Sequence, residues 1–142
     1  MKQDCTFCRI IAGEEHGAFV YEDDRVVAFL DINQASPGHT LIVPRTHVAH
    51  WWELPDEDAA AVAVIAKPIM QAIRRVFQPD GMNLVQNNGR AAGQVIFHVH
   101  MHVIPRWSGD RRFGRPPAYA DRQTLDERAA QIRAALEEFL SR

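Results

Sequence analysis

The sequence has little cysteine and no long apolar run. Two cysteines, Cys5 and Cys8, are too few for a disulfide framework, and their Cys-x-x-Cys spacing in a reducing compartment indicates metal ligands or a redox pair. No segment approaches the ~20 apolar residues that a membrane span requires, and the first residues contain no apolar stretch of signal-peptide length. We therefore expect a cytoplasmic protein without a membrane partner.

The sequence also lacks an excess of charge of one sign. Its formal net charge is −2, which provides no basic field for a nucleic-acid backbone. Positive charge is concentrated only in the loop 106–115, which would either steer a small anion or face solvent; the cluster consists of Arg106, Arg111, Arg112 and Arg115. Apolar residues make up 46% and charged residues 24% of the 142 residues, which is typical of one globular domain.

The spacing of apolar residues predicts an α+β fold. Five segments have the composition of strands, at residues 18–21, 25–30, 40–44, 82–86 and 97–104. Apolar residues spaced by three and four predict one long helix that begins near Asp56. A C-terminal helix is predicted after the long loop, with Thr124 and Glu127 as its capping box. Strands grouped around one long helix, without regular alternation, indicate an antiparallel sheet.

Three of the seven histidines, His98, His100 and His102, alternate with apolar residues in the last predicted strand. Successive side chains of a strand point to opposite faces, so the three rings should share one face. The outer two would stand ~13 Å apart, so one metal ion could hold two of them but hardly all three. The row suits a nucleophile with a neighbour on each side, because neutral imidazole is nucleophilic and titrates near neutral pH. The bland alternative is a half-buried strand with histidines on its polar face.

A polar loop that contains glycine precedes this strand. Gly89 and Gly93 would let backbone N–H groups approach a ligand closely, and Asn87 and Gln94 can hydrogen-bond to nonbridging phosphate oxygens. The same composition fits an ordinary β-turn. Beside three histidines, the loop favours a phosphate site.

The segment His98-Val-His100-Met-His102-Val-Ile resembles the histidine-triad signature, His-φ-His-φ-His-φ-φ. Over about residues 4 to 106 the chain looks like the nucleotide-binding branch of that superfamily, in its bacterial form with an N-terminal Cys-x-x-Cys. The further matches are Phe7, Ile10, Ile11, Phe29-Leu30-Asp31-Ile32, Pro37-Gly38-His39-Thr40, Pro44-Arg45-Thr46-His47 and Gly93-Gln94. The resemblance implies a five-stranded antiparallel sheet that continues across a homodimer. It also implies a HIT domain over residues 1–106, with a variable C-terminal loop and helix over residues 107–142 packed on the same domain.

The resemblance implies an activity as well. His100 would attack the α-phosphorus of a purine nucleotide conjugate, and water would then cleave the nucleotidyl-histidine, without a catalytic metal. His98, His102 and Gln94 would assist this chemistry. The conjugate would be a phosphoramidate, a dinucleoside polyphosphate or a nucleotidyl sulfate. Some members carry Ser or Thr after the Gln to protonate the leaving group, whereas this chain has Val95, so substrates with a good leaving group should be affected least.

The resemblance assigns binding roles position by position. Asp31 would hold the ribose hydroxyls, and His39 would support the triad from behind. The apolar slot around the base would consist of Phe7, Ile10, Phe29 and Ile32. The phosphate contacts would come from Asn87, Gly93, Gln94 and His102.

Resemblance to bacterial members implies a structural zinc ion, whose ligands would be Cys5, Cys8, His47 and His98. His50 competes with His47 for the third position. Two other function classes remain open. A metal-dependent hydrolase would use His98 and His100 with a carboxylate and would lose activity on chelation. A nucleotide sensor would bind a nucleoside monophosphate without turnover.

Overall fold

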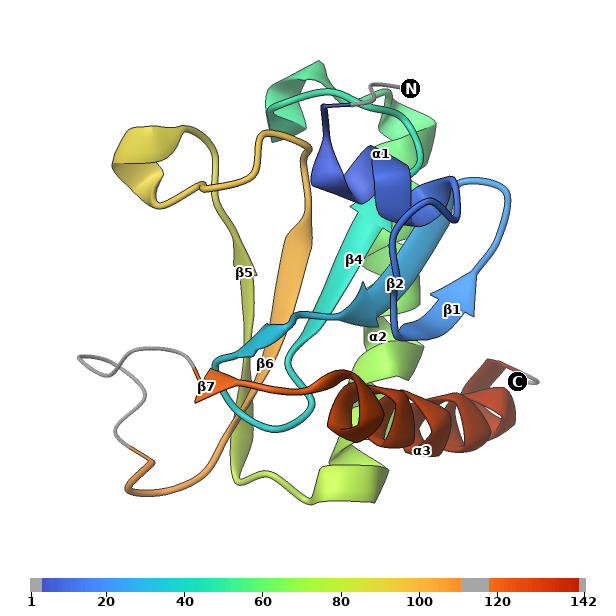
Figure 1. Cartoon of the computed structure of the whole chain (residues 1–142), viewed down its shortest axis with the longest axis vertical. Helices are drawn as coiled ribbons and strands as arrows, with labels where there is room; N and C mark the ends of the chain where they lie inside the picture. Colours follow the sequence, from blue (N-terminus) through green and yellow to red (C-terminus); the bar gives the residue numbers. More distant parts are fainter. Residues whose placement is uncertain (1–3, 111–117, 141–142) are drawn as a thin grey trace.

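A five-stranded antiparallel sheet forms the centre of the molecule (Figure 1). The computed structural model describes residues 4–110 and 118–140. Its strands are β1 (Phe19–Glu22), β2 (Val26–Leu30), β3 (Asn33–Gln34), β4 (Thr40–Pro44), β5 (Gly81–Gln86), β6 (Met101–Arg106) and β7 (Ala118–Tyr119). Its helices are α1 (Thr6–Ile11), α2 (Asp56–Phe77) and α3 (Arg122–Leu140), with short 3₁₀ turns at Trp51–Glu53 and Arg90–Ala92. The order β1-β2-β4-β6-β5 confirms the predicted α+β fold with its five-stranded antiparallel sheet.

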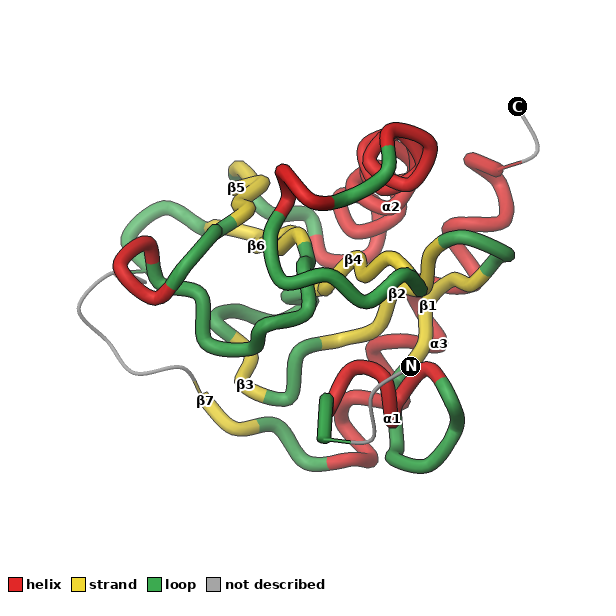
Figure 2. Tube along the Cα trace, turned by 90° about the horizontal axis from the view of Figure 1, so that it is seen from above, coloured by secondary structure: helices red, strands yellow, loops and turns green. Residues whose placement is uncertain are grey.

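Strand β2 separates two apolar cores. All five of its residues are buried, and alternate side chains point to opposite faces of the sheet. Val26, Ala28 and Leu30 pack into the core beneath α2 and α3, whereas Val27 and Phe29 pack into a smaller core beneath α1. Figure 2 shows α1 and α2 on opposite sides of the sheet. The smaller core is the floor on which the candidate site is built.

Helix α2 begins where the sequence predicts it, directly after Pro55. Asp56, Glu57 and Asp58 lie in its first turn, where negative charge interacts favourably with the helix dipole. Its apolar face is buried against the sheet, and the residue that follows its last turn, Gln78, adopts the left-handed conformation with φ 51°. Among the described residues, no helix combines the length and apolarity needed to cross a membrane.

The C-terminal segment is tied to the rest of the chain more closely than the sequence suggested. Strand β7 pairs with β3, and Ala120 N–H donates to the carbonyl of Ile32, which places this segment beside Asp31. The capping box predicted at Thr124 is wrong, because α3 begins at Arg122 and the side chain of Asp121 accepts from Thr124 N–H at 2.8 Å. Of the predicted arginine cluster, Arg106 forms a two-pronged pair with Asp110, and the other members, Arg111, Arg112 and Arg115, lie outside the described residues.

Candidate active site

The histidine segment enters strand β6 later than the sequence predicted. The strand begins at Met101 and not at Phe97, so His98 and His100 precede it. Backbone groups of this segment form hydrogen bonds with other parts of the chain and not with a neighbouring strand. Val99 N–H donates to the carbonyl of Val48 at 2.8 Å, and the carbonyl of His100 accepts from the side-chain amide of Gln86 at 3.4 Å. His98 and His100 therefore lie just outside the sheet, before the first paired residue of β6.

His98 is fully buried and directs its two nitrogens away from solvent. Its Nε2–H donates to the carbonyl of Pro44 at 2.8 Å, which leaves Nδ1 as a lone-pair nitrogen. Burial, with smaller contributions from His47 and His100, lowers the pKa of His98 to about 4. A neutral ring with a fixed tautomer is suited to metal ligation.

His100 is held with one nitrogen occupied. Its Nδ1–H donates to the carbonyl of His98 at 2.7 Å, so the unprotonated nitrogen of the neutral ring is Nε2. The ring lies edge-on to Phe7, with centroids 5.0 Å apart. Burial lowers the pKa of His100, and the hydrogen bond to His98 opposes part of that effect. The ring is therefore neutral, and nucleophilic, at neutral pH.

A chain of hydrogen bonds fixes which ring nitrogen of a neutral His102 carries the proton. Ala35 N–H donates to Nδ1 of His39 at 3.1 Å, so a neutral His39 carries its proton on Nε2. That Nε2–H donates to Nδ1 of His102 at 2.9 Å, which places the proton of a neutral His102 on its Nε2. Asp31 Oδ2 lies 3.7 Å from His39 Nε2, and burial raises the pKa of Asp31. His102 is thus set up as a hydrogen-bond donor beside His100, whose ring centroid is 4.8 Å away.

A pocket of about 290 Å³ opens in front of these rings. Seven of the nine residues assigned to substrate binding line it, together with the proposed nucleophile His100; the seven are Phe7, Ile10, Phe29, Asp31, Ile32, Gly93 and His102. Phe7 and Phe29 meet edge to face at 5.4 Å and form an aromatic floor. The polar groups Asp31, His100 and His102 converge on an otherwise mostly apolar cavity, as is typical of a nucleotide or cofactor site.

Asn87 and Gln94 are placed differently from the other assigned residues. Gln94 is buried, donates to the carbonyls of Ala49 and Ile96, and accepts from Gly89 N–H at 2.7 Å. Its amide therefore braces the glycine loop from inside and does not line the pocket. Asn87 does not line it either, although its side-chain nitrogen lies 3.8 Å from the point where a side chain on Gly93 would begin.

Other residues that line the pocket were not predicted from the sequence. Thr6 comes from helix α1, His16 from the loop that follows it, and Leu125 from α3. A six-residue helix leaves too few periodic positions to be recognised, and Leu125 belongs to a helix that begins 92 residues after the end of β2, the nearer in sequence of the two strands it contacts. Nε2 of His16 lies within hydrogen-bond distance of Oδ1 of Asp126, at 2.9 Å, and this contact joins the loop after α1 to α3 at this wall.

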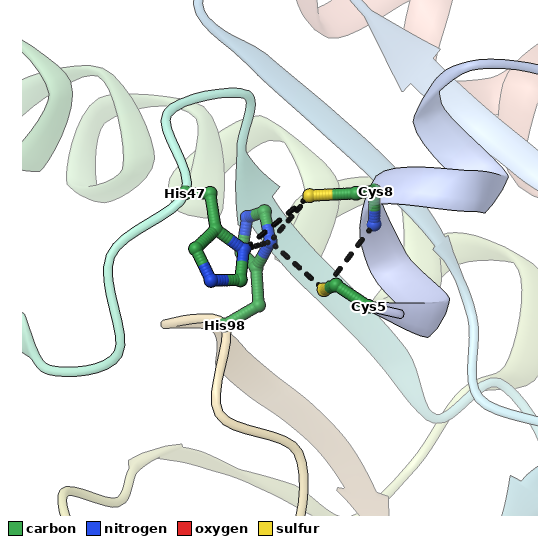
Figure 3. Close-up of side chains that lie close together, drawn as sticks. All are labelled: Cys5, Cys8, His47 and His98. Carbon is green, nitrogen blue, oxygen red and sulfur yellow. Dashed lines mark hydrogen bonds between the residues drawn. The ribbon is translucent and has the colours of Figure 1, made fainter. Parts of the chain in front are cut away.

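Two cysteines and two histidines, one of them His98 of the triad, point toward one another (Figure 3). The ligand atoms of Cys5, Cys8, His47 and His98 all lie within 4.8 Å of one another. The closest pairs are 3.1 Å for the two Nδ1 atoms and 3.3 Å for Cys8 Sγ and His47 Nδ1, and Nδ1 of His98 lies 3.5 and 3.6 Å from the two sulfur atoms. A tetrahedral zinc ion holds such atoms roughly 3.3–3.8 Å apart, from bonds of ~2.3 Å to sulfur and ~2.0–2.1 Å to nitrogen. The donor set and its spacing therefore fit zinc.

Contacts of the neighbouring residues explain why His47, and not His50, belongs to this cluster. His50 is not part of it, because its Nδ1 pairs with Glu53 at 2.9 Å and its ring stacks on Trp52. Thr46, the residue before His47, donates to the buried carboxylate of Asp58 at 2.8 Å. The loop that carries His47 is thereby fixed to the first turn of α2.

Comparisons with known proteins agree with this fold. The profile of the HIT domain matches residues 12–109. The adenylylsulfatase HINT3 of Arabidopsis thaliana is 40% identical over 132 residues, which cover 93% of this chain and 67% of that protein. A zinc-bound histidine triad family protein from Mycobacterium smegmatis has a solved structure that superposes with a TM-score of 0.85 at 37% identity, covering 97% of this chain and 96% of that one. A hypothetical histidine triad nucleotide-binding protein from Sulfolobus tokodaii superposes with a TM-score of 0.87 at 38% identity, covering 95% and 93%.

Proposed function

The chain belongs to the HIT domain family, and from that membership we propose that it is a nucleotide-binding hydrolase or nucleotidyl transferase that acts at the α-phosphate of a purine nucleotide conjugate. The observation that carries this proposal is the state of His100. Its Nδ1–H is anchored on the carbonyl of His98, its ring is kept neutral by burial, and it lines a pocket suited to a nucleotide. Nε2 attacks phosphorus, the leaving group departs, and water cleaves the resulting P–N bond.

The other pocket residues take supporting roles. The aromatic floor of Phe7 and Phe29, with Ile10 and Ile32, receives the purine ring, and the Asp31 carboxylate accepts from the ribose hydroxyls. His102 donates from Nε2 to a phosphate oxygen, with His39 holding the tautomer that makes this possible. Gly93, at φ +94°, brings backbone close to the phosphate, and Gln94 keeps the loop in place.

Zinc in the cluster of Cys5, Cys8, His47 and His98 has a structural role in this proposal. Cys5, Cys8, His47 and His98 would fill all four positions of a tetrahedral zinc ion, so no position would be open to substrate. The zinc-bound protein from Mycobacterium smegmatis supports the choice of metal. When bound, the ion would cross-link α1, the loop after β4 and the triad segment.

A homodimer is the assembly that we propose, joined at strand β5. In the five-stranded sheet, β1 and β5 are the edge strands, and the side chain of Arg133 from α3 reaches over β1 to the carbonyl of Phe19. Strand β5 has exposed residues along it, including Leu84, which is 48% exposed. An uncovered edge with an apolar side chain is suited to pairing with a second copy.

The test of the activity is a comparison of turnover on three adenylyl conjugates: adenylylsulfate, an adenosine phosphoramidate and a dinucleoside polyphosphate. We expect release of adenosine monophosphate from at least one of them, and loss of that release in His100→Ala protein that still binds the monophosphate. More than a tenth of wild-type activity in the variant would contradict the covalent role. Binding by the wild type without turnover of any conjugate would indicate a sensor instead.

A further inference from the structure

Four side chains form a row across the sheet and give the pocket a direction. Phe19 of β1 lies opposite Phe29 of β2, and Phe29 lies opposite Leu41 of β4. Leu41 in turn lies opposite His102 of β6, and Figure 1 shows these strands side by side. Neighbouring strands are ~4.8 Å apart, so the first and last residues of the row stand ~14 Å apart. The pocket, which all but Phe19 line, therefore extends from the phosphate end at β6 toward β1.

His16 lines the pocket at its β1 end. It precedes Gly17, where an added Cβ would come within 2.6 Å of Ile10 and 3.1 Å of the Phe19 ring, so the chain passes directly against the apolar slot for the base. The other polar side chains that line the pocket lie toward the ribose and the phosphate; they are Thr6, beside Cys5 at the start of α1, and Asp31, Asn33, His100 and His102. Among the described residues, His16 is therefore the polar side chain best placed to meet the outer edge of a bound base.

The contact with α3 fixes the hydrogen-bonding state of His16. Its Nε2 lies 2.9 Å from Oδ1 of Asp126. A carboxylate only accepts hydrogen bonds, so this nitrogen carries the proton, and the neutral ring has its lone pair on Nδ1. No residue in the described part of the chain is hydrogen-bonded to Nδ1, and the side chain is 32% exposed. The β1 end of the pocket thus offers an acceptor that a ligand can reach.

A purine nucleotide whose phosphate lies at His100 directs the six-membered ring of its base toward this acceptor, because the sugar is attached to the five-membered ring. In adenine that ring carries an amino group, which donates hydrogen bonds, whereas guanine has an oxygen acceptor at the same position. We propose that His16 determines base specificity by accepting a hydrogen bond from the 6-amino group of adenine at Nδ1, with Asp126 as the residue that positions the ring. This inference rests on the proposed function.

A purely structural role for His16 makes a different prediction. If its contact with Asp126 served only to hold the loop after α1 against α3, loss of the ring would loosen the wall of the pocket and weaken every purine nucleotide alike. An acceptor that binds the amino group discriminates instead, because a base without that group leaves the acceptor unpaired. One hydrogen bond of this kind, partly open to solvent, should change the Kd by about fivefold.

The experiment compares equilibrium binding of adenosine monophosphate and purine riboside 5′-monophosphate, which lacks only the 6-amino group, at about pH 8, above the usual titration range of imidazole. Wild-type protein should bind adenosine monophosphate about fivefold more tightly. His16→Leu should remove this preference by weakening adenosine monophosphate alone, and Asp126→Ala should reduce it. His50→Leu is the matched control, because His50 has the same 2.9 Å contact with a carboxylate, of Glu53, and does not line the pocket; it should change neither Kd.

Equal Kd values for the two nucleotides in the wild type would overturn the inference, whether or not the variants fold, and would leave the proposed function intact. An equal loss of affinity for both nucleotides in His16→Leu would overturn it as well, because that result indicates a structural role. A preference for adenosine monophosphate that is lost in His16→Leu would support the inference even if wild-type protein turned over no conjugate, a result that would contradict the catalytic proposal alone. Failure of both nucleotides to bind would contradict the nucleotide site and this inference together.

Discussion

Removal of zinc should destabilise this protein and weaken its hold on nucleotide while the chemical step continues. Cys5 caps helix α1 by accepting from Cys8 N–H, and both cysteines belong to the candidate zinc cluster. Phe7 and Ile10 of the same helix line the nucleotide pocket. Loss of the ion would release the start of α1 and with it one wall of the base slot. The nucleophile would keep its place, because His100 lies outside the cluster.

The size of the effect follows from mass action. A ligand that binds only the folded state at about 100 times its Kd stabilises that state by ~2.7 kcal/mol. For a domain of this length each kcal/mol shifts the melting temperature by ~2–4 °C, so zinc should raise it by about 5–10 °C. Below the melting temperature, chelated protein should show a KM raised several-fold and a kcat close to that of the zinc-loaded protein, because the interaction lost is one of ground-state binding.

The assay combines thermal melts with steady-state kinetics on protein purified without a histidine tag. Elemental analysis should give about one zinc per chain, and Cys5→Ala with Cys8→Ala should abolish it. His50→Ala is the matched control, because His50 lies close by and outside the cluster. Protein that is zinc-free as isolated and indifferent to added zinc in melts would refute the site. Immediate loss of kcat on chelation would refute its structural role and point to a catalytic metal.

Three further predictions concern the pocket. Asp31→Ala should raise KM for ribonucleotide substrates more than for 2′-deoxy analogues, since the deoxy compound makes only part of the lost contact; equal increases would mean that Asp31 does not bind the ribose. His39→Leu should lower kcat with a smaller change in KM, and by less than the about 10²–10³-fold that loss of a transition-state donor itself costs, because His39 only orients the donor His102; unchanged kcat would contradict the role of the hydrogen-bond chain to His102. Because burial lowers the pKa of His100 in the free protein, its neutral form persists to lower pH than that of an ordinary imidazole, so kcat/KM should hold as the pH falls through 6.5 and decline only below it; a decline that begins above pH 6.5 would contradict this.

Local pattern was sufficient for the main elements of the fold. Strands β2 and β4 are continuous apolar runs, and α2 has an apolar stripe with acidic residues at its start. Helix α1 was not predicted, because its six residues are stabilised by the cap at Cys5 and by contacts with a distant core. Strands β3 and β7 have two residues each and exist only as a long-range pair. Such elements depend on tertiary contacts that no local window contains.

The candidate site, like the fold, could be predicted from the sequence only in part. Alternation predicted that the three histidines share a face, and His98 and His100 do both lie against Phe7. It did not predict that the chain leaves the ladder before Met101, where Val99 bonds to Val48 and His98 to Pro44. Gln94 was assigned to the phosphate from its place beside the triad, whereas its amide is held by three backbone groups of the loop and its neighbours. Which atoms satisfy a buried amide depends on packing that sequence spacing does not report.

The most direct test of the account is to trap the covalent intermediate on His100. Wild-type protein mixed with an adenylyl conjugate and quenched within a few turnovers should carry one adenylyl group, and peptide mapping by mass spectrometry should place it on His100. His100→Gly protein should carry none, and it should regain turnover only with an adenylyl-imidazole substrate, which supplies the missing ring. An adenylyl group on His98 or His102, or full turnover by His100→Gly protein on the ordinary conjugates, would contradict the account.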